Sequence, residues 1–199
     1  MRIGVLGTGT VGRTIAAKLR ELGHDVLIGS RTAGDDAVPF PDAAAHGELV
    51  FNCTAGVASL DALGAAGEEK LTGKVLVDVT LPLDFSQGRP PRLFVCNDDS
   101  LGEQIQRAFP ETRVVKTLNT VNASVMVDPI PGTTLFVCGN EEEAKAQVGE
   151  LLQSFGWPAD AIIDLGDITN ARGTEMYLPL WIRLMGALGT ARFNIAVVQ

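Results

Sequence analysis

The chain has little of what a metal site or a disulfide framework requires. Its 199 residues include two histidines and three cysteines. Cys53, Cys96 and Cys138 share no CxxC spacing and stand at the ends of apolar runs, and His24 and His46 have no metal-type spacing. We therefore expect three reduced thiols at strand ends, no disulfide and no metal ligands.

Positive charge and long apolar runs are also scarce. The chain has 16 Lys and Arg residues against 24 Asp and Glu residues, which gives a net charge of −8. This negative charge disfavours nucleic acid or an anionic membrane surface as the main partner. The apolar segment 176–188 is too short, and too interrupted by Pro179 and Arg183, to span a membrane. The N-terminus enters a strand without a cleavable apolar region, so a cytoplasmic location is expected.

The residues that are present are organised around the first 31 positions. A GxGxxG sequence at residues 7–12 lies between an apolar strand and a segment with helical periodicity. That context predicts a dinucleotide site: Gly7 permits the tight turn, Gly9 admits the diphosphate, and Gly12 lets helix and strand pack closely. The diphosphate would bind the free N–H groups at the helix N-terminus. The alternative is an empty glycine turn in another α/β protein.

The end of the second predicted strand indicates which dinucleotide binds. NAD sites place an Asp or Glu there, whereas this chain has Gly29-Ser30-Arg31. A hydroxyl and a guanidinium would bind a 2′-phosphate that a carboxylate would repel. The cofactor predicted is NADP(H). The alternative is that Arg31 is a solvated surface charge.

Apolar stretches alternate with helical patterns along the rest of the chain. Strands are expected at residues 48–53, 74–79, 113–118, 133–138 and 161–165, and helices at residues 57–67, 100–109 and 141–155. This alternation predicts an α/β fold, a Rossmann-type doubly wound, mostly parallel sheet with a short C-terminal helical addition. Residues 1–166 would form the dinucleotide-binding domain, and residues 167–199 a helix and a closing strand packed on it.

Two other segments leave alternatives open. Residues 84–94 would form a solvated loop, or a lid whose arginines meet an acidic substrate tail. In the tail, an apolar stripe over residues 178–188 suits the core, a subunit interface or a planar ligand, and makes a homodimer through this segment a hypothesis. Arg172 and Glu175 stand three residues apart and could pair.

Four segments in this order resemble one family. They are Gly7 to Gly12, Gly29-Ser30-Arg31, Val115 to Val121, and Ala171 to Glu175 with Leu180-Trp181-Ile182. Together, and over nearly the whole chain, they are similar to the coenzyme F420-dependent NADP oxidoreductases. The resemblance implies direct hydride transfer between nicotinamide C4 and deazaflavin C5.

The resemblance also implies a set of site residues. The diphosphate would be held by Thr8, Gly9, Thr10 and Val11, and the 2′-phosphate by Ser30 and Arg31. The ribose and nicotinamide would be bordered by Thr54, Val57 and Ala58, with Asn119 and Ala123 opposite. The deazaflavin would be flanked by Pro82 and Trp181. Family members usually carry a Lys a few residues after the Arg. Here Ala33-Gly34-Asp35-Asp36 follows, which makes Arg31 more critical.

The sequence has no plausible Ser/His/Asp set and no motif of paired carboxylates. Hydride transfer between stacked rings needs proximity and alignment more than a side-chain acid, so no catalytic side chain is expected. Lys116, the one lysine in the interior of a predicted core strand, is expected to be structural. The rival hypotheses are an NADPH-dependent reductase of a flavin (FMN or FAD) or of ferric iron, and a non-catalytic NADPH-binding sensor.

Overall fold

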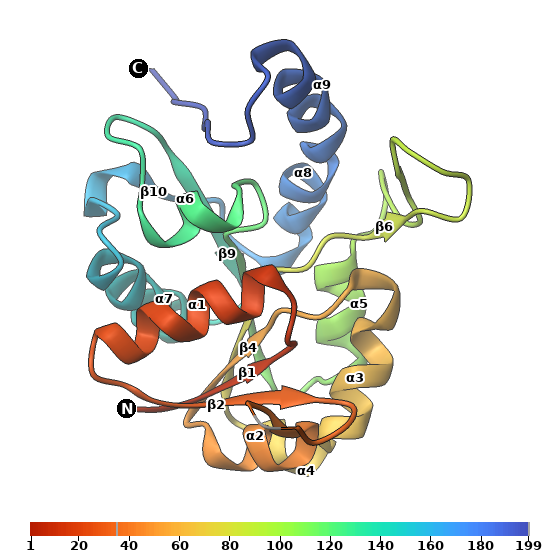
Figure 1. Ribbon diagram of the computed structural model, residues 1–199, viewed down its shortest axis with the longest axis vertical. Coiled ribbons are helices and arrows are strands. Elements are labelled where there is room, and N and C mark those ends of the chain that lie inside the picture. Colours follow the sequence, from red (N-terminus) through yellow and green to blue (C-terminus); the bar gives the residue numbers. More distant parts are fainter. Residues whose placement is uncertain (35, 199) are drawn as a thin grey trace.

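The computed structural model describes residues 1–34 and 36–198, and the described residues form a three-layer α/β fold around an eight-stranded sheet (Figure 1). The strand order is β10-β9-β8-β5-β4-β1-β2-β3. Its strands are β1 (Arg2–Leu6), β2 (Asp25–Ser30), β3 (Val38–Pro39), β4 (Leu49–Asn52), β5 (Val75–Asp78), β8 (Arg113–Thr117), β9 (Leu135–Gly139) and β10 (Ile162–Asp164). The described part of the chain contains no helix long and apolar enough to cross a membrane.

The helices lie mainly between successive strands. The α-helices are α1 (Thr10–Glu21), α2 (Phe40–His46), α3 (Ser59–Ala66), α4 (Glu68–Leu71), α5 (Leu101–Ala108), α6 (Ala123–Val127), α7 (Glu142–Ser154), α8 (Ala171–Met176) and α9 (Leu178–Leu188). Three short 3₁₀ helices are η1 (Gly56–Ala58), η2 (Ala159–Ala161) and η3 (Ile168–Asn170).

Both faces of the sheet are buried, because alternate side chains of each strand point to opposite layers. On β5, Val75 and Val77 belong to one apolar cluster and Leu76 to the other. Buried side chains of α1, α6 and α7 join the first cluster, and those of α2, α3, α4 and α5 join the second. The doubly wound fold expected from the sequence is therefore confirmed.

Neighbouring strands are parallel except for β8 and β9, which are antiparallel; β10 is parallel to β9, so these two strands run opposite to the rest of the sheet. The direction of β9 differs from that of β8 because the short helix α6, rather than a full crossover, connects the two strands. The expectation of a mostly parallel sheet is thus correct, and the one reversal lies away from the β1, β2 and β4 edge.

Two expectations for the loops and tail are corrected. Residues 84–94 are not a plain loop: β6 (Leu83–Asp84) and β7 (Arg92–Leu93) pair antiparallel and make a hairpin that projects from the body (Figure 1). The closing strand expected at residues 194–198 is wrong. That stretch has no strand assignment, because Ile195 and Val197 hydrogen-bond only to Thr134, before β9 begins.

Candidate functional site

A cavity of about 850 Å³ opens where β1, β2 and β4 end. The chain leaves β1 for β2 on one side and later returns to β4 on the other, so this is the switch point at which doubly wound sheets bind ligands. The wall consists of Gly7, Thr8, Gly9, Ser30, Arg31, Thr32, Phe40, Cys53, Thr54, Ala55, Ala58, Asp61, Ala62 and Ala65. Of the residues predicted to bind the cofactor, the cavity brings together seven: Gly7, Thr8, Gly9, Ser30, Arg31, Thr54 and Ala58.

The three motif glycines have different surroundings. Gly7 has a φ of +124°, and a Cβ there would lie 2.5 Å from the carbonyl oxygen of Cys53. A Cβ on Gly12 would collide with the carbonyl oxygen of Gly7. A Cβ on Gly9 would meet no protein atom within 4 Å. Packing therefore explains the first and last glycines, whereas Gly9 leaves open space suited to a diphosphate.

Helix α1 presents its N-terminus to the cavity. It begins at Thr10, directly after the cavity residue Gly9, and no side chain caps it. The first N–H groups of a helix have no partner within the helix, and the helix dipole favours an anion there. Thr10 and Val11 do not line the cavity, so their part in diphosphate binding rests on their backbone N–H groups in this first turn.

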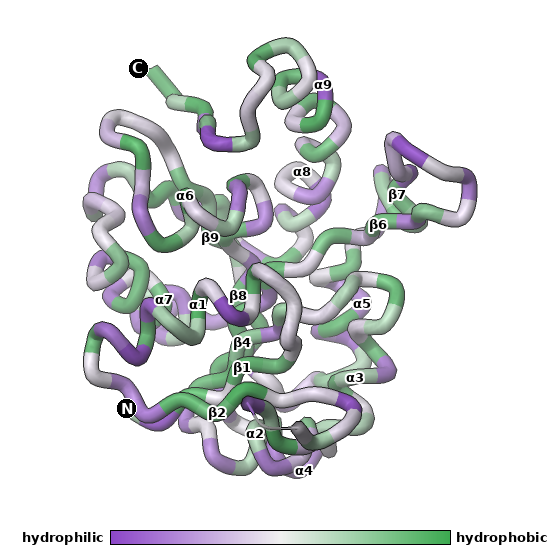
Figure 2. The backbone as a smooth tube through the Cα atoms, viewed as in Figure 1, coloured by the Kyte–Doolittle hydropathy of each residue, from purple (hydrophilic) through white to green (hydrophobic). Residues whose placement is uncertain are grey.

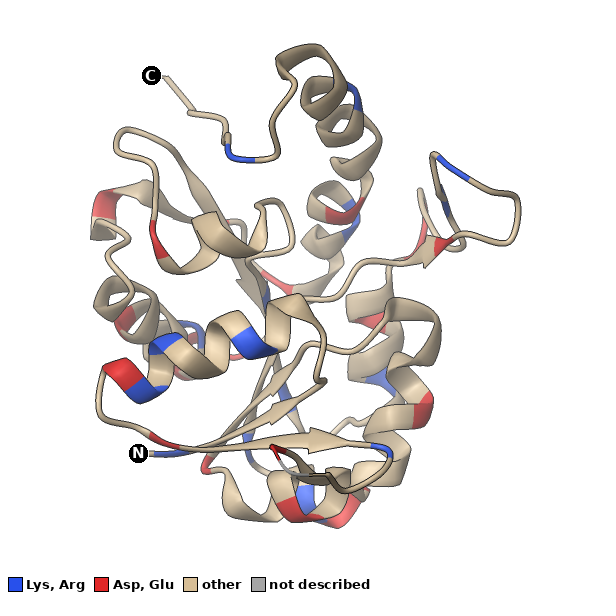
Figure 3. Ribbon diagram, viewed as in Figure 1, with Lys and Arg blue, Asp and Glu red and all other residues tan. Residues whose placement is uncertain are grey.

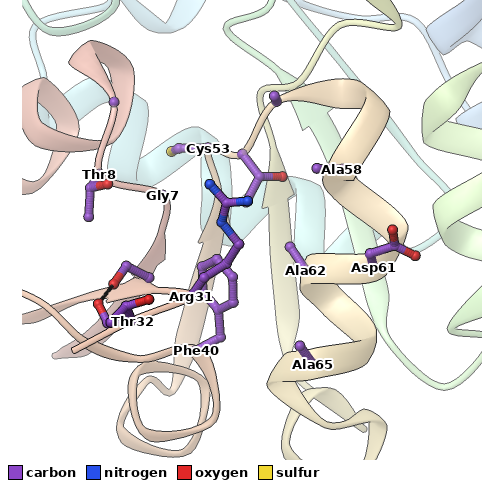
Figure 4. A pocket seen from close by; sticks show the side chains of 14 residues that line it. Gly7, Thr8, Arg31, Thr32, Phe40, Cys53, Ala58, Asp61, Ala62 and Ala65 are labelled. Carbon is purple, nitrogen blue, oxygen red and sulfur yellow. Dashed lines mark hydrogen bonds between the residues drawn. The ribbon is translucent and has the colours of Figure 1, made fainter.

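Arg31 extends into the cavity from the end of β2. Figure 4 shows its side chain between the glycine loop with Thr8 and helix α3 with Asp61 and Ala62. Among residues 1–34 and 36–198, none forms a hydrogen bond or an ion pair with its guanidinium. Ser30 lines the same cavity, and its hydroxyl donates to the carbonyl oxygen of Thr32. Arg31 thus presents a cation to the cavity, as a 2′-phosphate requires, and the Ser30 hydroxyl could donate to a phosphate by turning away from Thr32.

The residues predicted to border the ribose and nicotinamide are divided between two hollows. Thr54 and Ala58 line the main cavity, and the Thr54 hydroxyl donates to Asn52 Oδ1 at 2.8 Å. Val57 does not line it: this side chain is 64% exposed and faces a neighbouring hollow of about 260 Å³ that Phe94 also lines.

Four other predicted residues lie outside the main cavity wall. Asn119 follows β8 and is buried, and its Nδ2 has no hydrogen-bond partner among the described residues. Ala123 begins α6, and Pro82 is buried after β5. On α9, Trp181 stacks on Phe193 with ring centroids 5.2 Å apart. A buried donor without a partner is costly, so the Asn119 amide suits a ligand acceptor.

A buried charged network lies behind the cavity, and sequence reasoning missed most of it. Lys116 Nζ lies 2.8 Å from Asp78 Oδ2, 2.8 Å from Glu175 Oε1 and 2.6 Å from the carbonyl oxygen of Thr80. Asn52 Nδ2 donates to Asp78 Oδ1 at 3.0 Å, so the network continues to Thr54 in the cavity wall. The signal in the sequence was a charged residue inside each of two apolar strands.

The network retains its charge on Lys116. Burial lowers the pKa of this lysine, but the carboxylates of Asp78 and Glu175 outweigh burial, and the net pKa is raised. The buried contacts of Lys116 with Asp78 and Glu175 agree with the structural role expected from the sequence.

The expected pairing of Arg172 with Glu175 is wrong. Arg172 binds both carboxylate oxygens of Glu103, at 2.6 and 2.8 Å, which lowers the pKa of Glu103. Glu175 instead accepts from the N–H groups of Leu101 and Gly102, at 2.8 and 3.0 Å, at the N-terminus of α5. Both side chains therefore tie α8 to α5, and Glu175 also pairs with Lys116 in the sheet.

Comparison with known proteins agrees with this geometry. The family model described as NADP oxidoreductase coenzyme F420-dependent matches residues 2–82. The F420-dependent NADP reductase of Methanocaldococcus jannaschii is 30% identical over an alignment of 212 positions that covers 92% of each chain. A crystal structure from Arthrobacter sp. FB24, provisionally named an F420-dependent NADP-reductase, is 53% identical, with a TM-score of 0.95 over all of both chains.

A further relative is Metalloreductase STEAP3 of Rattus norvegicus, which is 28% identical over 197 residues. The match covers 90% of this chain but only 38% of that protein. The family that these comparisons show uses NADP(H), in agreement with the cofactor predicted from the sequence. The chain belongs to the family of coenzyme F420-dependent NADP oxidoreductases and is an NADP-dependent oxidoreductase.

Proposed function

We propose that the protein transfers a hydride between NADP(H) and a deazaflavin coenzyme of the F420 type. The observation that carries this proposal is the end-to-end similarity to an F420-dependent NADP reductase, which covers 92% of both chains and therefore includes most of the tail. NADP(H), when bound, gives or takes the hydride at its nicotinamide ring.

The proposed cofactor position follows the cavity. The N-terminus of α1 and the glycine loop hold the diphosphate, with Gly9 leaving the space for it. Ser30 and Arg31 hold the 2′-phosphate. Thr54, Val57 and Ala58 border the ribose and nicotinamide, with Ala123 opposite, and the unpaired Asn119 Nδ2 donates to the carboxamide oxygen. These residues position the ring and exclude water; none moves a proton.

The proposed deazaflavin site uses Pro82 and the apolar tail. Helix α9 has no buried residue, although its sequence is apolar, as Figure 2 shows. Trp181 and Phe193 form a stacked aromatic pair, a surface suited to a planar ring. Although Trp181 as a whole is partly exposed, its indole Nε1 atom is buried, as is the Tyr177 hydroxyl oxygen. Neither atom has a hydrogen-bond partner among the described residues, so both would donate to the polar edge of the ring.

We expect the purified protein to reduce oxidised F420 with NADPH under anaerobic conditions. The measurement is the loss of deazaflavin absorbance after mixing, with NADH in place of NADPH, and FMN in place of F420, as controls. Bleaching with the pair of F420 and NADPH, but with neither control, would support both the acceptor and the Ser30-Arg31 assignment. The proposed acceptor would be refuted if the protein binds NADPH but neither bleaches oxidised F420 with NADPH nor restores the absorbance of reduced F420 with NADP⁺.

Reduction of a flavin or of ferric iron is the second candidate, and the similarity to a metalloreductase favours it. That similarity covers 38% of the relative, so most of that protein has no counterpart in this chain. Bleaching of FMN alone, or reduction of a ferric chelate alone, would identify this acceptor instead.

We also propose that a second copy of the chain covers part of α9. Leu180 and Leu188 are 55% and 57% exposed, and Val197 and Val198 in the following segment are exposed as well. Burying these side chains in a symmetric interface would remove apolar surface from water. Light scattering at micromolar concentration should give the mass of a dimer. A monomer at that concentration would contradict the proposal.

A further inference from the structure

The loop after Arg31 has the wrong charge for a phosphate neighbour. Residues 32–37 contain two aspartates and no lysine or arginine. Asp36 is one of them, and its side chain is 71% exposed. A dianionic 2′-phosphate beside this loop would be repelled unless a second cation compensated.

Helix α1 supplies a cation at this place. Arg13 Nη1 lies 3.3 Å from Asp36 Oδ2, and Arg13 Nε donates to the carbonyl oxygen of Thr8 at 3.0 Å. Thr8 lines the same cavity as Ser30 and Arg31. The Arg13 guanidinium therefore spans the gap between the glycine loop and the loop after β2.

The backbone holds these two loops together. Gly7 N–H donates to the carbonyl oxygen of Gly29 at 2.9 Å, which joins the glycine loop to the end of β2. Gly34 and Ala37 hydrogen-bond to each other, and Asp36, which precedes Ala37, contacts Arg13 of α1. Figure 3 shows basic positions along α1 and at the end of β2. Arg31 lines the main cavity, and Arg13, which lines the neighbouring hollow, reaches the cavity residue Thr8 from α1.

The pair of Arg13 with Asp36 is one that a phosphate can replace. The two side chains are 52% and 71% exposed, and an exposed ion pair of this kind is weak. A hollow of about 460 Å³ beside the pair, lined by Arg13 and Asp36 among others, gives the guanidinium room to turn. A phosphate group carries more negative charge than a carboxylate and offers more acceptor oxygens.

We propose that Arg13 is a second cation of the 2′-phosphate subsite. Its guanidinium pairs with Asp36 in the free protein and exchanges that carboxylate for the phosphate when NADP(H) binds. Arg13 thereby determines cofactor specificity together with Arg31. The inference rests on the proposed position of the 2′-phosphate at Ser30 and Arg31.

Equilibrium titration with NADPH and with NADH, followed by nicotinamide fluorescence, tests the role of Arg13. We expect Arg13→Gln to weaken NADPH binding about fivefold and NADH binding less than about twofold. Arg13→Lys should keep most of the preference, because the charge remains. Asp36→Asn should strengthen NADPH binding about threefold without changing NADH binding, because it removes a competing carboxylate. Lys18→Gln, which removes a charge on the same helix that pairs with Glu21, is the matched control and should change neither.

The outcomes separate this inference from the proposal on which it rests. If Arg31→Ala abolishes the NADPH preference while Arg13→Gln preserves it, only the role of Arg13 is refuted. Equal weakening of NADPH and NADH by Arg13→Gln would mean that Arg13 merely supports the glycine loop, and would also overturn the inference. If the wild-type protein binds both cofactors equally, the subsite at Ser30 and Arg31 and the role of Arg13 both fall.

Discussion

Replacing Arg31 by alanine should weaken NADPH binding roughly 10- to 100-fold and leave NADH binding nearly unchanged. The guanidinium enters the cavity without an ion-pair partner among the described residues, so the 2′-phosphate would supply its counter-charge. Charge-assisted hydrogen bonds to a phosphate contribute about 1.5–3 kcal/mol, and NADH lacks the group that would accept them. Equilibrium titration with both cofactors measures the effect.

Two variants make this test specific. Arg31→Lys keeps the charge but loses the planar fork of donors, so it should retain part of the NADPH preference. Arg107→Ala removes an exposed arginine on α5 that pairs with Asp99, so it changes the net charge equally without touching the cavity. Equal loss of affinity for NADPH and NADH in Arg31→Ala would refute the assignment of the 2′-phosphate to this residue.

Replacing Lys116 by methionine should reduce the free energy of unfolding by about 3–5 kcal/mol, a large share of the stability of a typical domain. The lysine side chain is fully buried between Asp78 and Glu175, and its removal leaves two buried carboxylates without a cation. Burying an unpaired charge costs far more than a surface ion pair contributes. Denaturant unfolding at neutral pH measures the loss.

A triple variant tests whether the uncompensated carboxylates cause this loss. Lys116→Met combined with Asp78→Asn and Glu175→Gln removes every charge of the triad, and should be more stable than Lys116→Met alone. If the single and triple variants are equally unstable, packing rather than charge explains the effect.

The pH dependence of stability follows from the same lysine. Its folded pKa is raised above the ordinary value of 10.5, because the two carboxylates outweigh the effect of burial. Its stabilising contribution is therefore fully present below about pH 10.5, and is lost as pH rises through the folded pKa. Unfolding measured from about pH 9 to about pH 12 should show a decline in the wild type that begins above about pH 10.5 and is smaller in the triple variant.

Most of the sheet could be predicted from the sequence, because a strand buried on both faces appears as a short apolar run. Residues 48–53 and 74–79 are such runs, and β4 and β5 lie within them. The antiparallel direction of β9 could not be predicted, since strand direction depends on the connection and leaves no mark in the strand's own residues. The hairpin of β6 and β7 has two residues in each strand, too few for a periodic pattern.

The candidate site divides in the same way. The glycine loop and Ser30-Arg31 are local features, because a GxGxxG turn and the residue ending the next strand have defined positions in this fold. Arg13 and Asp36 are 23 positions apart in the sequence, and Lys116 and Glu175 are 59 positions apart. Spacing along a chain does not reveal such pairs.

The sequence by itself determined the Rossmann-type architecture and the NADP(H) cofactor, since both depend on periodicity and on short motifs whose residues are neighbours in the chain. Only the tertiary structure decided which charges meet. Arg172 turned to Glu103 and Glu175 to Lys116, although a local pair was available. The reason is physical: a buried charge must be compensated wherever folding places it, and packing of α8 against α5 and the sheet brought those partners together.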